Sequence, residues 1–82
     1  MNFNEIHNII GVREDVDNVL ADLNHFLFDN VGQFFKIGEG PDGPTATWSR
    51  SWSRGNFPLT VYMQEVAAIL RRKLDIAAHV VP

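Results

Sequence analysis

The apolar residues of this chain change their spacing twice along the sequence. Between Val12 and Leu27 they recur at the spacing of one buried helix face. From Gln33 onward, short aromatic and β-branched runs separated by turn residues are typical of strands, and a second helical spacing begins near Pro58. A chain of 82 residues has room for one hydrophobic core. The sequence therefore predicts a single α+β domain over residues 1–82, with the order helix, helix, β-hairpin, helix.

Two helices are predicted before the extended region. A short helix over 4–10 precedes a longer one over 13–29, because the apolar stripe shifts its phase around Gly11, although glycine is also tolerated within one continuous helix. Acidic side chains in the first turns of the longer helix suit the positive end of its dipole, which places its start near Arg13. Gly32 is predicted to end it.

A β-hairpin is predicted for the middle of the chain. Its strands cover residues 34–37 and 45–53, and the segment 38–44 between them is rich in glycine and proline. That composition predicts a wide loop. Because an isolated two-stranded hairpin is marginally stable in water, we expect it to pack on the helices or to pair its edge with another chain.

The last third of the chain is predicted to begin as a helix at Pro58 and to end in a segment with two interpretations. The apolar face of the helix consists of Leu59, Tyr62, Met63, Val66, Leu70, Leu74 and Ala77. Ile69 is placed at its margin, and the cations of residues 71–73 complement the C-terminal end of the helix dipole. Residues 75–82 either extend the helix or form a short third strand through residues 79–81.

The segment from Thr45 to Arg54 carries the strongest functional signal. Alternate residues of a strand face opposite sides, so Trp48, Arg50, Trp52 and Arg54 would share one face, with serine and threonine on the other. Trp and Arg are enriched at interface hot spots, and an arginine between two indoles gains cation–π attraction. We therefore predict these four residues to be the partner-binding set of a non-catalytic protein-binding module, an adaptor or an inhibitor of a larger protein.

Two other interpretations of this tryptophan-arginine face stay open. One or both tryptophans could pack in the core, which would draw the arginines inward and require an acid, a carbonyl group or a partner molecule to meet them. The face could also bind single-stranded nucleic acid, because aromatic rings interleaved with arginine stack bases. Seven basic residues and a net charge of −3 limit the phosphate contacts that such binding needs.

Charge is distributed unevenly along the chain. Residues 1–31 hold six acidic residues and one arginine, whereas residues 32–82 hold four acidic and six basic residues. The two regions could be separate solvated faces, or their opposite charges could steer two halves of one chain, or two copies, together. Together with the short chain and the unsupported hairpin, this makes a homodimer a further prediction.

The composition excludes several classes of function. The chain has no cysteine, so disulfides, thiolate nucleophiles and cysteine zinc sites are excluded. On one continuous helix His7 and His25 would lie about 27 Å apart, too far to share a metal. We predict no enzymatic activity, no cofactor and no metal site. The sequence has neither a recognisable signal peptide nor an apolar run of about 18 residues, which predicts a cytoplasmic protein without a membrane segment.

Overall fold

The computed structural model of the chain describes residues 3–11, 15–49, 51 and 57–81, with side chains for all of them except 57–60. Its elements are α1 (Asn4–Gly11), α2 (Val16–Val31), β1 (Lys36–Gly40), β2 (Gly43–Ser49), α3 (Phe57–Leu74) and β3 (Ala77–Val81). The predicted α+β class is confirmed, and a third strand follows the last helix. The Cα radius of gyration, 11.8 Å, is about that of a compact chain of this length.

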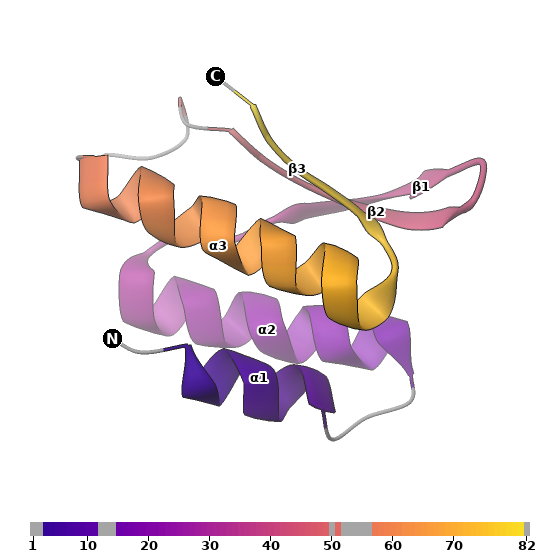
Figure 1. The fold of residues 1–82 in the computed structure, drawn as a ribbon, viewed down its shortest axis with the longest axis horizontal. Helices are drawn as coiled ribbons and strands as arrows, with labels where there is room; N and C mark the ends of the chain where they lie inside the picture. The colour runs from indigo at the N-terminus through magenta and orange to yellow at the C-terminus, as the bar shows by residue number, and fades with distance from the viewer. Residues whose placement is uncertain (1–2, 12–14, 50, 52–56, 82) are drawn as a thin grey trace.

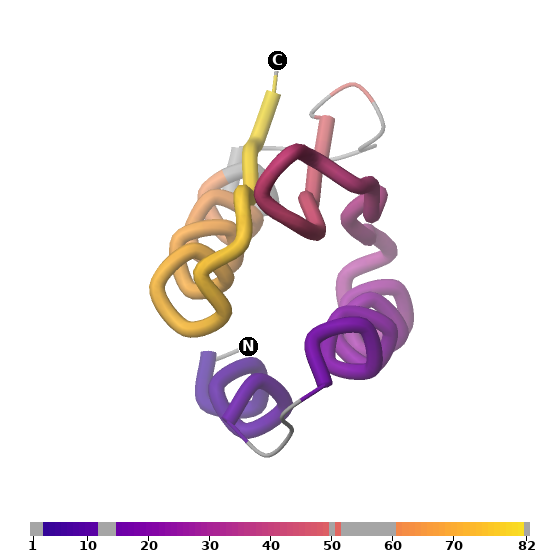
Figure 2. The backbone as a smooth tube through the Cα atoms, turned by 90° about the vertical axis from the view of Figure 1, so that its right-hand side faces the viewer, coloured from indigo at the N-terminus to yellow at the C-terminus, as the bar shows by residue number. Residues whose placement is uncertain are grey.

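The sheet lies on one side of the pair α2 and α3, and α1 lies on the other side of this pair (Figure 1, Figure 2). The strand order is β1-β2-β3, so β2 is central. β1 is antiparallel to β2, whereas β3 is parallel to β2 and is reached through α3, the kind of crossover that parallel neighbours need. The helix α1 contacts both other helices, and α3 contacts β3. The core is therefore enclosed between the sheet and the three helices.

The core draws its side chains from all three helices and from the sheet. Its largest fully buried members are Trp48, Phe35, Ile6, Leu20, Leu23, Leu27, Met63, Ile69 and Leu70. Ile69, which the sequence places at the margin of the apolar face, is fully buried. Because α3 contacts β3 as well as α1, a wider part of its surface is covered than one stripe would provide.

Caps fix both ends of α2. The carboxylate of Asp15 accepts hydrogen bonds from the backbone N–H groups of Asp17 and Asn18, at 3.0 and 3.4 Å. The sequence predicts a start near Arg13, but this N-cap makes the helix begin at the next residue, Val16. At the other end Gly32 adopts a left-handed φ of 70° and ends the helix, which confirms the predicted C-cap.

The hairpin is confirmed, but its predicted wide loop is wrong. Only Pro41 and Asp42 separate β1 from β2, and a proline at the second position with Gly43 at the fourth suits a tight type I turn. The other glycines of this segment belong to β1. A Cβ atom added to Gly40 would lie 2.9 Å from Cγ2 of Thr45, so glycine is needed there for the close approach of a neighbouring side chain.

The two faces of β2 alternate as predicted. Ala46 and Trp48 are buried toward the helices, whereas Thr45 and Thr47 are half-buried on the opposite face. The strand ends at Ser49, earlier than the predicted residue 53. There the Ser49 hydroxyl accepts a hydrogen bond from the N–H of Ser51 at 3.3 Å, a local side-chain contact that competes with continued strand pairing.

The last segment of the chain is a strand. The helix α3 ends at Leu74, and Asp75 follows with a left-handed φ of 53°, which turns the chain back toward the sheet. Residues 77–81 then pair with β2 along the edge opposite β1. Of the two interpretations of residues 75–82, the structure therefore shows the strand. Ala77 belongs to this strand rather than to the apolar face of the helix.

Candidate functional site

The predicted contact residue Trp48 lies in the core. Its side chain is 0% exposed, and its indole Nε1–H donates a hydrogen bond to the side-chain oxygen of Gln33 at 2.9 Å. Because Gln33 is also buried, this bond satisfies the polar atom of the indole away from solvent. The structure thus corrects the place of Trp48: its ring packs against the helices and is not presented to a partner.

The other members of the predicted contact set lie outside the described residues. Arg50, Trp52 and Arg54 belong by sequence to the connection between β2 and α3. Their role in binding stays a prediction. For Trp48 the structure shows the alternative that the sequence leaves open, a position in the core.

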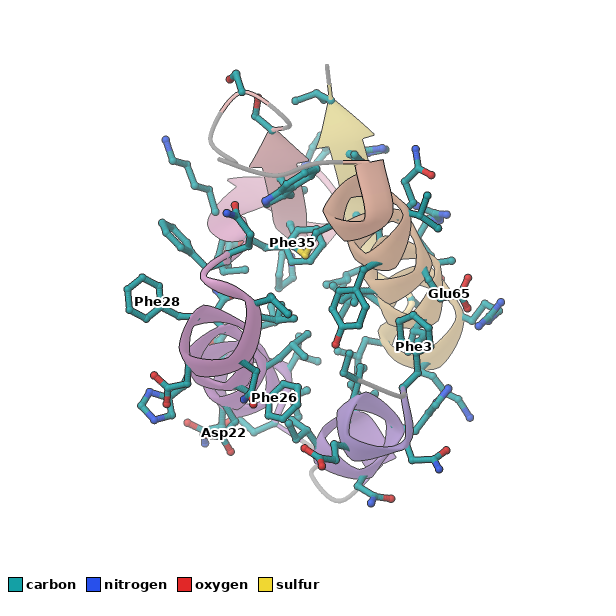
Figure 3. All side chains as sticks on the ribbon, turned by 90° about the vertical axis from the view of Figure 1, so that its left-hand side faces the viewer. Phe3, Asp22, Phe26, Phe28, Phe35 and Glu65 are labelled. Atoms are coloured by element: carbon teal, nitrogen blue, oxygen red, sulfur yellow. The ribbon has the colours of Figure 1, made fainter. Side chains whose placement is uncertain are left out.

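A pair of exposed phenylalanines distinguishes the side of the molecule formed by α2 and β1. Phe28 is 61% exposed and Phe34 44% exposed, and their ring centroids lie 6.4 Å apart with the planes tilted by 57°. Figure 3 shows Phe28 directed away from the core, beside α2. Ile37 on β1 is 42% exposed. We refer to Phe28 and Phe34 as the phenylalanine patch.

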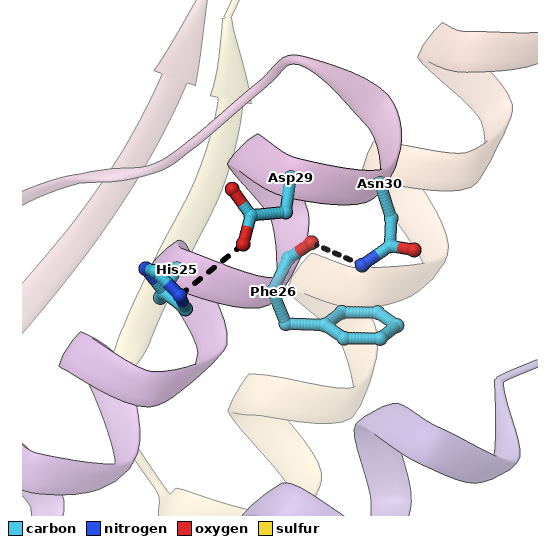
Figure 4. Close-up of polar contacts among 4 residues, drawn as sticks. All are labelled: His25, Phe26, Asp29 and Asn30. Atoms are coloured by element: carbon cyan, nitrogen blue, oxygen red, sulfur yellow. Dashed lines mark hydrogen bonds and ion pairs between the residues drawn. The ribbon is translucent and has the colours of Figure 1, made fainter.

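Exposed carboxylates lie on α2 and on the hairpin. Asp22 and Asp29 are exposed on α2, and Glu39 and Asp42 are exposed on β1 and its turn, where Lys36 is the nearby cation in the sequence. One carboxylate oxygen of Asp29 lies 3.2 Å from Nε2 of His25, one helical turn earlier (Figure 4). Both of these side chains remain largely exposed, so the pair leaves the acidic character of this side accessible to solvent.

A side-chain amide holds the start of β1 against α2. The amide Nδ2 of Asn24 donates to the carbonyl oxygen of Phe35 at 2.8 Å, and its Oδ1 accepts from the N–H of the same residue at 2.9 Å. One asparagine thus satisfies both backbone groups of a residue whose side chain is buried. Asn24 therefore forms the two backbone hydrogen bonds that a neighbouring strand would otherwise form at this residue.

The pairing of the hairpin defines which backbone groups point out of the sheet. Glu39 pairs with Pro44, which has no N–H and so fits a pair without the two ladder hydrogen bonds. Because hydrogen-bonded pairs alternate in an antiparallel ladder, Ile37 and Glu39 direct their backbone groups away from β2. Among the described elements β1 pairs with β2 alone, and residues 37–39 are exposed.

The opposite edge of the sheet is partly covered. Arg71 of α3 donates from Nη1 to the carbonyl oxygen of Ala78 in β3, at 2.7 Å. An open hollow of about 350 Å³ beside it is lined by Gln64, Ala67, Arg71, His79 and Val80. Since the arginine is engaged with the backbone and lies across the strand edge, this edge is less accessible to an added strand than the β1 edge.

The titratable side chains of the described residues form no metal-binding cluster. No group of three histidine, aspartate or glutamate side chains among them could hold a metal ion. Burial, and secondly the charge of Glu5, raise the pKa of Tyr62, whose ring stacks on Phe3 with centroids 4.9 Å apart. A tyrosine with a raised pKa stays neutral at ordinary pH, which suits packing between α1 and α3.

The comparisons with known proteins identify no relative. No family model matches the chain, and no curated protein or solved structure matches it either. In the part of the chain that the structure describes, no helix is long and apolar enough to cross a membrane. The phenylalanine patch and the adjacent β1 edge are therefore the features from which a function is inferred.

Proposed function

We propose that the chain is a non-catalytic protein-binding module, an adaptor or inhibitor, that binds its partner through the phenylalanine patch. The observation that carries the proposal is the contact between two exposed phenylalanine rings, Phe28 and Phe34. Single exposed apolar residues are ordinary, but adjacent exposed aromatic rings offer a large apolar area that a partner can bury. Aromatic side chains are also enriched at protein interfaces.

The surroundings of the patch favour a protein over a nucleic acid. Asp29 directly follows Phe28 in α2, and its exposed carboxylate would repel phosphates beside the patch. The burial of Trp48 also removes one of the two indoles on which the nucleic-acid prediction depends. A partner protein can instead meet Asp29 with a basic side chain while its apolar residues cover the rings.

The predicted tryptophan-arginine set, without the buried Trp48, remains a second part of this proposal. Arg50, Trp52 and Arg54 follow β2 in the sequence and stay candidates for partner contact. Binding that depends on both sets would show losses on substitution in each. Binding that depends on the patch alone would be insensitive to Trp52→Ala.

The proposal is tested by capturing partners from an extract of the native host. The bait proteins are the wild type, Phe28→Ser, and a matched control, Val61→Ser, which changes a comparably exposed apolar residue on α3. We expect Phe28→Ser to lose proteins that the wild type and the control both retain, because a central aromatic contact is worth about 2 kcal/mol or more when truncated. Identical capture by all three baits would contradict the proposal.

A further inference from the structure

We propose that the free edge of β1 binds a basic, partly apolar segment of the partner protein as an added β-strand. The inference rests on the proposed function and specifies what the partner presents to it. An extended peptide that joins a sheet edge forms main-chain hydrogen bonds, while its alternate side chains meet the surface beside that edge. Three features of the α2–β1 side point to this occupant.

The first feature is the hydrogen-bonding pattern of the edge. At Phe35 both backbone groups are bonded to the amide of Asn24, so the edge here already holds a donor and an acceptor in the arrangement that a peptide unit provides. Two residues farther along, Ile37 presents the same outward N–H and C=O groups, and Glu39 follows after two more. These residues are exposed, so a strand lying in line with the Asn24 amide could reach both.

The second feature is the apolar surface next to this edge. Ile37 pairs with Ala46, whose side chain is buried toward the helices, so Ile37 also lies on the helix side of the sheet. An added strand would place every second side chain on that side, beside Ile37 and near α2. The exposed side chain of Ile37 would then cover an apolar residue of the added strand.

The third feature is charge, which selects a basic partner over a second copy of the chain. Glu39 shares the helix side of β1 with Ile37, and Asp42 is exposed in the turn that follows this strand. Antiparallel pairing of two β1 edges about a two-fold axis would bring the Glu39 side chains of both copies to the same face of a joint sheet. That arrangement sets like charges against each other, whereas lysine or arginine in a partner strand would neutralise them.

The test uses two short synthetic peptides as probes and the full chain as receptor. Both peptides have threonine at every second position. The remaining positions alternate between valine and lysine in one peptide and between valine and glutamate in the other. Binding is measured by fluorescence anisotropy at low salt, and the contact is located by amide hydrogen exchange. We expect the lysine peptide to bind about tenfold more tightly, because several exposed charge pairs act together. Exchange should slow at Ile37 and Glu39.

Two variants at one position separate the backbone contact from the charge. Glu39→Pro removes an outward N–H, while its pair with Pro44 needs none, so the hairpin is expected to persist. Glu39→Gln removes the charge and keeps the N–H. We expect the lysine peptide to bind Glu39→Gln with slowed exchange at Ile37 and to lose binding to Glu39→Pro.

Several results would overturn the inference. These are failure of the lysine peptide to bind, equal binding of both peptides, or slowed exchange confined to another edge or face of the wild type. A wild-type dimer that protects the same two amides without peptide would make a second copy the occupant instead. If Phe28→Ser loses the captured partner while Glu39→Pro retains it, strand addition fails and the proposed protein-binding function stands.

Discussion

Trp48 and Gln33 satisfy one another inside the protein. The indole fills space between the sheet and the helices, and its N–H bond to Gln33 connects β2 with the segment that precedes β1. A buried polar atom that loses its partner costs about 1–3 kcal/mol, more than the net gain from most hydrogen bonds. The pair therefore fixes where β2 lies over the helices.

Replacing Trp48 tests this pairing. Trp48→Phe keeps an aromatic ring but leaves the oxygen of Gln33 buried without its donor, and we expect the free energy of unfolding to fall by about 1–3 kcal/mol. Trp48→Ala also leaves a cavity and should cost about 3–5 kcal/mol. Urea unfolding followed by circular dichroism measures both. Adding Gln33→Met to Trp48→Phe should restore part of the loss, and no restoration would argue against the unpaired oxygen as the cause.

The sequence carried only part of the information about the candidate site. Strand alternation correctly separates Trp48 from its threonine neighbours, but it cannot say which face is covered, since that depends on how β2 lies over α2 and α3. The exposure of Phe28 is easier to infer from the sequence, because this residue falls outside the apolar stripe of its helix. Its contact with Phe34 depends on the turn at Gly32 and could not be obtained from spacing.

Among the elements, the hairpin shows how glycine can belong to a strand. Thr45 leans over β1, where its Oγ1 would be 3.2 Å from a Cβ added to Gly38, and its methyl group would be closer still to one on Gly40. The absence of side chains at these positions lets neighbouring strands approach. A tight turn can then follow directly, without the wide loop that the composition predicts.

Substitution of Gly40 measures this constraint. Gly40→Ala places a methyl group 2.9 Å from Cγ2 of Thr45, and we expect it to destabilise the protein by about 1–3 kcal/mol through overpacking. Thr45→Ser removes that Cγ2 and should recover most of the loss in the double variant. Gly11→Ala is the control, because an added Cβ there meets nothing within 4 Å and alanine suits a helix better. A similar loss in both glycine variants by thermal unfolding would refute the steric explanation.

The elements defined by local signals were predicted well, and those defined by distant contacts were not. Periodic spacing and the Gly32 cap identify α2 because each signal lies within or next to the helix. The residues of β3 fit either a helix end or a strand, and pairing with the free side of β2 decides between them. Ser49 likewise ends β2 through a contact with Ser51 that strand propensity does not reveal.

At the scale of the whole molecule, the uneven charge of the sequence becomes a difference between two sides. The acidic residues Asp22 and Asp29 lie on α2, whereas the cations of residues 71–73 lie in the last turn of α3 (Figure 2). A basic segment would thus be steered toward the α2–β1 side, where the phenylalanine patch and the β1 edge are found. Added salt should lower the association rate of this segment more than it raises the rate at which the segment dissociates from the apolar contact.

The docking of α1 on α3 makes the stability of the whole fold depend on pH in the alkaline range. Phe3 stacks on Tyr62, and burial together with Glu5 raises the pKa of the tyrosine, so the folded state favours the neutral phenol. The unfolded chain ionises near pH 10, so this stabilisation is complete below about pH 10 and is lost as the pH rises through the higher folded value. Urea unfolding at several alkaline pH values should show a decline that is smaller in Tyr62→Phe, and Glu5→Gln should lower the pKa of Tyr62. Because the chain has one tyrosine, phenolate absorbance reports this group directly, and ionisation at or below the ordinary tyrosine pKa would contradict the prediction.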